Sequence, residues 1–203
     1  IQGFVNYPID NLYAMPLLRD YIKEKLSDNG DLSDIVIVSP DAGGAKRAEH
    51  LAKKLGADLA IFSKKRDRAN EVSKMILVGE VHGKKCVIVD DMVDTGGTLT
   101  LAAKQLVEYG ATEVYAACSH GVLSPPAIDR INASPIKELL LTDTIPLDDK
   151  VASCNKITIV PVAGLLAEAI DRVHTGRSLS HLFDAQSKLV VKGGTPERKR
   201  DRN

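Results

Sequence analysis

The stretch of sequence that decides the fold covers residues 86–98 and reads Cys86-Val87-Ile88-Val89-Asp90-Asp91-Met92-Val93-Asp94-Thr95-Gly96-Gly97-Thr98. Its apolar first part, residues 86–89, predicts a buried strand, and a helical pattern of apolar residues begins near Leu99. Between them, Gly96 and Gly97 permit backbone angles and a close approach that a Cβ would block. Successive backbone N–H groups can therefore converge on one phosphate at the N-terminus of the predicted helix.

Polar side chains surround the two glycines of this stretch. Thr95 and Thr98 add hydroxyl donors, and Asp94 follows the acid pair Asp90 and Asp91. The two carboxylates lie next to the expected phosphate and carry the same sign of charge, so they do not bind it themselves. They are better suited to accept hydrogen bonds from sugar hydroxyls or to hold a divalent cation. A plain strand-to-helix turn with capping acids is the alternative. The combination of acids, threonines and glycines favours a site for a phosphorylated ribose.

Short apolar runs that predict strands recur along the chain, at residues 35–39, 59–62, 86–89, 114–118, 139–142 and 157–160. Helical patterns occupy residues 16–26, 45–55, 99–109, 126–131 and 162–174. This alternation predicts an α/β fold, with a doubly wound, mostly parallel sheet covered by helices on both faces. Ligands bind beyond the carboxyl ends of the strands in such sheets, and Asp41 and Asp90 both lie at those ends.

A second glycine loop follows the first predicted strand and reads Ser39-Pro40-Asp41-Ala42-Gly43-Gly44. It repeats the order of strand, acid, glycine pair and helix, so its backbone N–H groups can receive a second anion. Asp41 can hold Mg²⁺ beside that anion. Taken alone, the loop fits an ordinary helix start equally well. Two such loops at strand ends favour one site for a ribose phosphate and one for pyrophosphate.

Two segments are basic and lack apolar periodicity. The first, residues 64–71, gathers several cations around one acid, which predicts a solvated, mobile loop. The second, the tail of residues 188–203, is polar and basic, which predicts disorder. A basic tail can also contact RNA or acidic partners, but a solvated tail is the favoured interpretation.

Composition limits the classes of function. The 203 residues contain 27 basic and 27 acidic side chains, so the whole molecule has no net charge with which to gather nucleic acid or an acidic membrane. Cys86, Cys118 and Cys154 are widely spaced and odd in number, which predicts buried, reduced thiols and an intracellular setting. The sequence shows neither a run that could span a membrane nor a signal peptide. We therefore expect a cytoplasmic protein.

Residues 90–98 are similar to the ribose-5-phosphate loop of the phosphoribosyl pyrophosphate synthetases, also called ribose-phosphate pyrophosphokinases. Four other stretches carry the same resemblance: residues 2–13, residues 38–47, residues 64–72 and residues 144–146. The resemblance runs from Ile1 to about Phe183. Ile1 aligns inside the family, after the part that supplies a metal-binding histidine and the adenine contacts, so the resemblance covers only the second half of a synthetase.

The resemblance divides the chain into four parts. Residues 1–15 are expected to be a remnant of the N-terminal domain, and residues 16–177 a catalytic domain of the phosphoribosyltransferase-like (type I) class. Residues 178–187 are expected to return to the N-terminal domain, and residues 188–203 form the disordered basic tail.

The implied activity is transfer of pyrophosphate from ATP to the 1-hydroxyl of ribose 5-phosphate, giving phosphoribosyl pyrophosphate and AMP, with Mg²⁺ as cofactor. By similarity, Lys64 is the catalytic lysine and Arg66 its companion. Gly43 and Gly44 belong to the pyrophosphate loop, and Asp41 to the metal. The implied ribose-5-phosphate ligands are Asp90, Asp91, Asp94, Thr95, Gly96, Gly97 and Thr98.

Regulation and assembly are implied in the same way. Ser178, Ser180 and Phe183 are similar to the segment where regulated synthetases place a phosphate or ADP effector between subunits, although the two serines equally suit helix or turn caps. Synthetases of this type form homo-oligomers. Two other functions remain open: a non-catalytic regulatory subunit associated with a synthetase, and a phosphoribosyltransferase.

Overall fold

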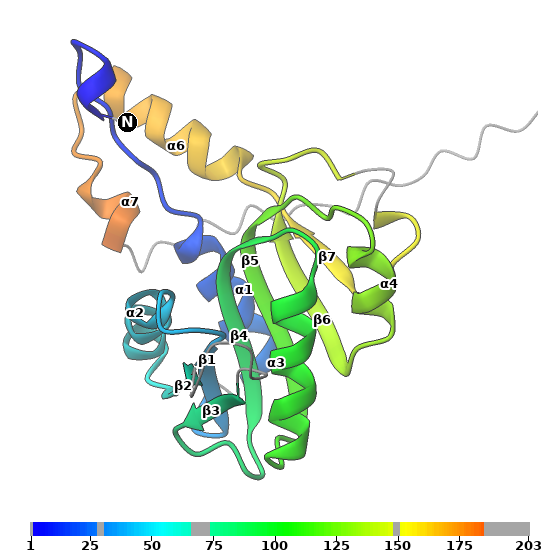
Figure 1. Cartoon of the computed structure of the whole chain (residues 1–203). Coiled ribbons are helices and arrows are strands. Elements are labelled where there is room, and N and C mark those ends of the chain that lie inside the picture. Colours follow the sequence, from blue (N-terminus) through cyan, green and yellow to red (C-terminus); the bar gives the residue numbers. More distant parts are fainter. Residues whose placement is uncertain (1, 28–30, 66–73, 148–150, 185–203) are drawn as a thin grey trace, which may run out of the picture.

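A computed structural model describes residues 2–27, 31–65, 74–147 and 151–184 of the chain. Its centre is a seven-stranded sheet in the order β3-β2-β1-β4-β5-β6-β7 (Figure 1). The strands are β1 (Ile35–Ser39), β2 (Asp58–Lys65), β3 (Lys74–Val78), β4 (Lys85–Val93), β5 (Glu113–Gly121), β6 (Ile136–Thr142) and β7 (Ile157–Val160). Neighbouring strands are parallel except β2 and β3, which are antiparallel. The prediction of a mostly parallel sheet is confirmed.

Helices cover both faces of this sheet (Figure 1). The helices of the described residues are η1 (Gln2–Phe4), which lies away from the sheet, α1 (Met15–Leu26), α2 (Ala45–Leu55), α3 (Gly97–Glu108), α4 (Ala127–Asn132), α6 (Ala163–His174) and α7 (Ser180–Asp184). Helices α3 and α4 contribute to the core on one face, whereas α1, α2 and α6 contribute to the core on the other. This arrangement confirms the doubly wound α/β fold.

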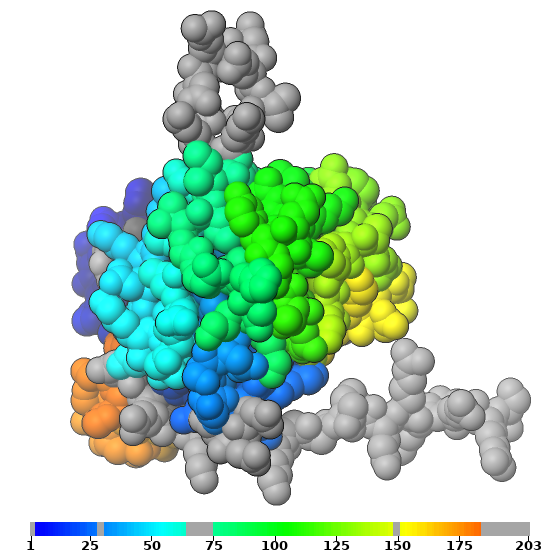
Figure 2. Space-filling view, turned by 90° about the horizontal axis from the view of Figure 1, so that it is seen from below, coloured from blue at the N-terminus to red at the C-terminus, as the bar shows by residue number. Residues whose placement is uncertain are grey.

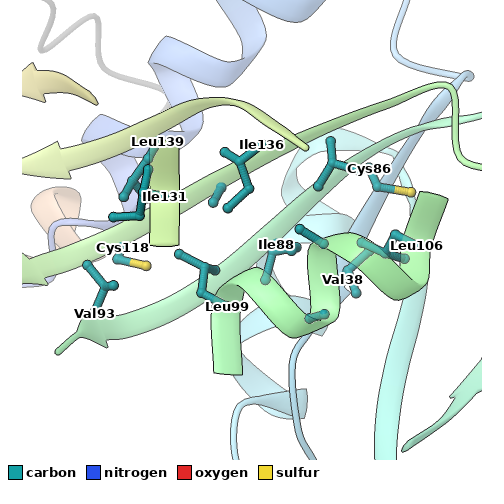
Figure 3. Packing of buried hydrophobic residues seen from close by; sticks show 14 of the residues in the cluster. Val38, Cys86, Ile88, Val93, Leu99, Leu106, Cys118, Ile131, Ile136 and Leu139 are labelled. Atoms are coloured by element: carbon teal, nitrogen blue, oxygen red, sulfur yellow. The ribbon is translucent and has the colours of Figure 1, made fainter. Parts of the chain in front are cut away.

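The side chains of β4 explain why residues 86–89 are continuously apolar. Cys86 and Ile88 belong to the core cluster that includes Leu106 of α3 (Figure 3). Val87 and Val89 belong to the cluster on the opposite face, with residues of α1 and α2. Because successive strand residues point to opposite faces, a strand buried on both sides must be apolar at every position.

The edge strand β3 is absent from the sequence prediction. It begins at Lys74, beside the basic segment, and is held by an antiparallel ladder to β2 that includes the pair Lys65↔Lys74. The prediction of a loop from residue 64 onward is wrong for Lys64 and Lys65, because this ladder keeps both in β2. The rest of that predicted loop, residues 66–71, lies outside the described residues.

The end of β4 also differs from the prediction. The strand runs to Val93 instead of ending at Val89, because its ladder to β5 continues through the pairs Asp90↔Cys118 and Met92↔His120. The acid pair therefore lies within the strand and not in the loop after it.

The N-terminal segment and α7 lie on the same side of the molecule in both views (Figures 1 and 2). The rings of Tyr13 and Phe183 meet edge to face, with their centroids 6.0 Å apart. Leu182 is buried in the core cluster that includes Leu17 and Leu18 of α1. The part of the chain after residue 178 thus packs beside residues near the start. The predicted domain boundaries remain predictions, and residues 188–203 lie outside the described residues.

All three cysteines are free and buried, as predicted. Burial raises the pKa of Cys86 to about 12, and it also raises the pKa of Cys118, so both thiols stay protonated at neutral pH. Within the described part of the chain, none of the helices combines the length and the apolar character that crossing a membrane requires.

We predict that Leu139→Ala lowers the free energy of unfolding by about 2–5 kcal/mol, because Leu139 is fully buried in the core under α3 and α4 and its truncation leaves a cavity. Leu101→Ala is the matched control, because Leu101 is 48% exposed on α3. Its effect should stay within about 0.5 kcal/mol. Urea denaturation measures both. Equal losses in the two variants would contradict the placement of the core.

Candidate active site

The first glycine loop joins the end of β4 to the start of α3. Gly96 is the N-cap residue of α3 and has φ of +71°, a left-handed conformation that favours glycine. Its carbonyl accepts a hydrogen bond from Thr100 Oγ1 at 2.9 Å. No side-chain hydrogen bond from the cap residue satisfies the first N–H groups of α3. These groups are consequently oriented to receive an anion.

Gly97 lies close to a side chain of the neighbouring helix. A Cβ at this position would lie 3.3 Å from Nη1 of Arg130, a side chain of α4. The same Nη1 donates to the carbonyl oxygen of Thr95 at 3.0 Å, so Arg130 holds the loop from the side of α4. The remaining predicted members of this loop, Asp94 and Thr98, are exposed at the start of α3. Arg130 is a residue that the sequence patterns do not identify.

The second glycine loop follows β1, the strand next to β4 in the sheet. Oδ1 of Asp41 accepts a hydrogen bond from the Gly44 backbone N–H at 3.0 Å, and the Ser39 hydroxyl donates to the Asp41 carbonyl at 2.7 Å. Added Cβ atoms would lie 3.2 Å from Asp41 Oδ1 at Gly43 and 2.8 Å from Ser39 Oγ at Gly44. The loop is closed so tightly that neither glycine has room for a side chain.

Arg47 connects the two regions. It lies in the first turn of α2, directly after the second loop. Its guanidinium contacts both acids near the end of β4, Asp90 and Asp91. Its Nη1 donates to Asp90 Oδ1 at 3.1 Å, and its Nη2 is 2.9 Å from Asp91 Oδ2. The structure therefore brings the acid pair next to the start of α2. Sequence reasoning gave Arg47 no role, although its place in a helix start after a glycine pair is a signal for a cation at an anion site.

The acid pair has an unusual electrostatic environment. Burial raises the pKa of Asp90 to about 6, and the negative charge of Asp91 adds to this effect while Arg47 opposes it. Burial also acts to raise the pKa of Asp91, but the hydrogen bond with Asp90 and the charge of Arg47 lower it overall. At neutral pH both carboxylates are available as hydrogen-bond acceptors.

Asp41 fits the predicted role of a magnesium ligand in one respect. It is a partly exposed carboxylate whose Oδ1 already accepts the Gly44 N–H, and carboxylate oxygen is the ligand type that Mg²⁺ prefers. The described residues contain no group of three or more His, Cys, Asp or Glu side chains that could hold a metal ion.

The predicted catalytic cations are Lys64 and Arg66, at the end of β2 and directly after it. Lys64 is in β2, where it pairs with Met75 of β3. Arg66 lies outside the described residues. Their predicted roles remain predictions.

The predicted effector residues lie at the start of α7. The Ser178 hydroxyl accepts a hydrogen bond from the Ser180 backbone N–H at 3.1 Å, and the two hydroxyls are 3.0 Å apart. This is the use of serine as a turn and helix cap. Phe183 contacts Tyr13. An effector role for these residues remains a prediction.

The parallel sheet, with two glycine loops at its carboxyl edge, places the chain among the doubly wound α/β proteins whose ligands bind beyond the strand ends. The family model described as phosphoribosyl synthetase-associated domain matches residues 67–184, more than half of the chain, and the chain belongs to this family.

Individual relatives agree. The chain is 52% identical over 183 residues to ribose-phosphate pyrophosphokinase 2 of Schizosaccharomyces pombe, covering 90% of this chain and 56% of the relative. It is also 52% identical over 184 residues to ribose-phosphate pyrophosphokinase 1 of Lactococcus lactis, covering 91% and 56%. The resemblance to the phosphoribosyl pyrophosphate synthetases is thereby confirmed. The chain spans about half the length of these relatives.

A solved structure shows the same fold. The crystal structure of phosphoribosylpyrophosphate synthetase from Mycobacterium smegmatis superposes with a TM-score of 0.76 at 40% sequence identity. The match covers 86% of this chain and 55% of that protein. The predicted fold class is therefore that of a known synthetase.

We predict that the side-chain carboxyl carbon of Asp90, followed by ¹³C NMR, titrates near pH 6. Because this pKa lies above the ordinary value of about 3.9, protonated Asp90 stabilises the fold at pH 4, and this contribution disappears as the pH rises through 6. Asp90→Asn should remove the titration and this part of the pH dependence. Asp129→Asn, which removes an exposed acid of α4, should change neither. A midpoint near pH 4 for Asp90 would contradict the role of burial.

Proposed function

We propose that the chain provides the ribose-5-phosphate and pyrophosphate sites of a ribose-phosphate diphosphokinase. Such an enzyme transfers pyrophosphate from ATP to the 1-hydroxyl of ribose 5-phosphate, giving phosphoribosyl pyrophosphate and AMP for nucleotide biosynthesis. One observation carries the proposal: two glycine loops on the neighbouring strands β1 and β4 lie on either side of an acid pair. The names of the relatives support this choice of substrates.

The first loop binds the sugar phosphate. The backbone N–H groups at the start of α3 receive the 5-phosphate, with the hydroxyls of Thr95 and Thr98 as further donors. Asp90 and Asp91 lie near the end of β4, just before the loop that leads to α3. They accept hydrogen bonds from ribose hydroxyls. The ribose is thereby held at both ends, which fixes the direction of its 1-hydroxyl.

The second loop binds the group that is transferred. In this proposal the loop of Gly43 and Gly44 holds the pyrophosphoryl group, so that the ribose 1-hydroxyl can attack the β-phosphorus of ATP in line. Lys64 and Arg66 neutralise charge on the phosphates during this displacement. Asp41 would hold Mg²⁺, which would supply positive charge for the phosphates of the substrate. The protein itself contributes positioning and electrostatic stabilisation.

A second candidate is a non-catalytic subunit that associates with a complete synthetase. Such a subunit would still bind ribose 5-phosphate. It would not form AMP by itself. A cytoplasmic setting fits both candidates and is supported by the three free, buried thiols.

We predict that the chain, mixed with ATP, ribose 5-phosphate and Mg²⁺ in phosphate buffer, forms AMP, and that Lys64→Ala slows this reaction about 10²–10³-fold. Lys104→Ala is the control, since it removes an exposed lysine of α3 and should leave the rate unchanged. AMP is measured by chromatography. Binding of ribose 5-phosphate without AMP formation would mean that the chain supplies only the sugar-phosphate half of a synthetase or is an associated subunit. Consumption of phosphoribosyl pyrophosphate with a free base would instead establish a phosphoribosyltransferase.

The proposal includes a homo-oligomer, and phosphate or ADP as effectors at Ser178, Ser180 and Phe183. Helix α6 supports the oligomer, because its large apolar side chains Leu166, Ile170 and Val173 are spaced along one face and all are exposed. Exposed apolar faces of this kind mark contacts between proteins.

We predict that Ile170→Glu lowers the molar mass of the chain in solution, measured by light scattering after gel filtration. A carboxylate in the centre of an apolar contact would be buried without a partner, which costs several kcal/mol. Leu101→Glu on the exposed side of α3 is the control and should keep the mass of the unchanged chain. A chain that is monomeric before any substitution would contradict the prediction.

A further inference from the structure

We propose that Arg47 is a positioning residue for the sugar: it holds Asp90 and Asp91 in the arrangement that recognises two neighbouring hydroxyls of the ribose. This inference rests on the proposed function, because it assigns the recognition of ribose 5-phosphate to the same acid pair. It adds a residue from α2 to a site otherwise built from β4 and α3.

The position of the acid pair within β4 creates a geometric problem that Arg47 solves. Successive residues of a strand point to opposite faces of the sheet, so two consecutive carboxylates should not meet the same ligand. Asp90 and Asp91 are consecutive, and both lie inside β4. Nevertheless, both carboxylates lie within 3.1 Å of one guanidinium, that of Arg47. The guanidinium is thus the group that brings the two carboxylates to the same place.

The contacts of Arg47 leave acceptors for a ligand. It uses Oδ1 of Asp90 and Oδ2 of Asp91, so the second oxygen of each carboxylate is not covered by the guanidinium. The backbone N–H of Asp91 also donates to Asp90 Oδ1 at 2.9 Å, which fixes that carboxylate further. The side chains of Asp90 and Asp91 also interact with each other, which keeps the two carboxylates together. Neighbouring sugar hydroxyls match such a pair of acceptors. The planar guanidinium can span two carboxylates, whereas an ammonium is a point charge.

Arg47 also ties the acid pair to the second loop. A Cβ on Gly44 would lie 3.5 Å from its Nη1, so the guanidinium passes directly beside the proposed pyrophosphate loop. Arg47 therefore fixes the position of the sugar hydroxyls relative to the group that is transferred. The side chain of Arg47 is 30% exposed and that of Asp91 is 60% exposed. An ion pair as exposed as this contributes little to the stability of the fold.

The test compares three ligands by isothermal titration calorimetry on the chain: ribose 5-phosphate, 2-deoxyribose 5-phosphate and inorganic phosphate. The unchanged protein should prefer ribose 5-phosphate to the deoxy sugar by about 10- to 100-fold, the range expected for a hydrogen bond to a charged group. Arg47→Gln should lose most of this preference and bind ribose 5-phosphate at least about 10-fold more weakly, because the carboxylates separate. Its affinity for inorganic phosphate should stay within about twofold of the unchanged protein.

Two further variants make the test specific. Arg47→Lys keeps the charge but cannot span both carboxylates, so its preference for the ribose should fall between those of the other two proteins. Lys53→Gln is the matched control, since it breaks an exposed ion pair with Glu49 on the same helix and should bind like the unchanged chain. Circular dichroism verifies folding. If Arg47→Gln fails to fold, the Arg47→Lys result decides.

The outcomes separate the two proposals. An unchanged preference for ribose in Arg47→Gln or Arg47→Lys would overturn the role of Arg47 and leave the proposed function standing. Equal weakening of inorganic phosphate and ribose 5-phosphate binding would likewise overturn it, because the effect would then be general attraction of anions. If the unchanged protein binds no ribose 5-phosphate, the proposed function fails, and this inference fails with it.

Discussion

The parallel pairing of β1 with β4 is the interaction on which the rest of the site depends. The ladder runs from Ile35↔Lys85 to Val38↔Ile88, and its apolar side chains are fully buried. Because parallel strands end at the same edge, the loops that follow them must be neighbours. The helices α2 and α3 begin from those loops on opposite faces of the sheet. The two loops are therefore adjacent as a consequence of the fold.

Local charge, and not the charge of the whole molecule, defines this edge. The chain has 27 basic and 27 acidic residues and no net charge. At the edge, backbone N–H groups at the starts of two helices provide positive potential for anions. Beside them, one arginine meets two carboxylates, which places negative charge next to the helix starts. In the proposed function, this separation of the two signs over a short distance distinguishes the phosphate end of the ligand from its hydroxyl end.

The sequence predicts those parts of the fold that depend on local patterns. The strands and helices follow from apolar runs and helical periodicity, and the two glycine loops from their residues. Edge strand β3 was missed although Met75-Ile76-Leu77-Val78 is an apolar run, because that run follows directly on the basic segment, and the antiparallel pairing with β2 that places it is not visible in the sequence. Arg47 was also missed as a partner of Asp90, because the two are distant in sequence and only the β1–β4 pairing brings them together. Arg130 meets Thr95 for a similar reason, through the packing of α4 beside α3.

The two glycine loops differ in how firmly the structure holds them. At Gly44 the nearest neighbour is the fully buried hydroxyl of Ser39, which is already engaged with the carbonyl of Asp41 and cannot move away. At Gly97 the nearest neighbour is the exposed, flexible side chain of Arg130, which can shift. A close contact with a fixed buried group costs more to relieve than one with the end of a long side chain. The loop after β1 is consequently the more tightly held of the two, and the loop after β4 has more room to adjust.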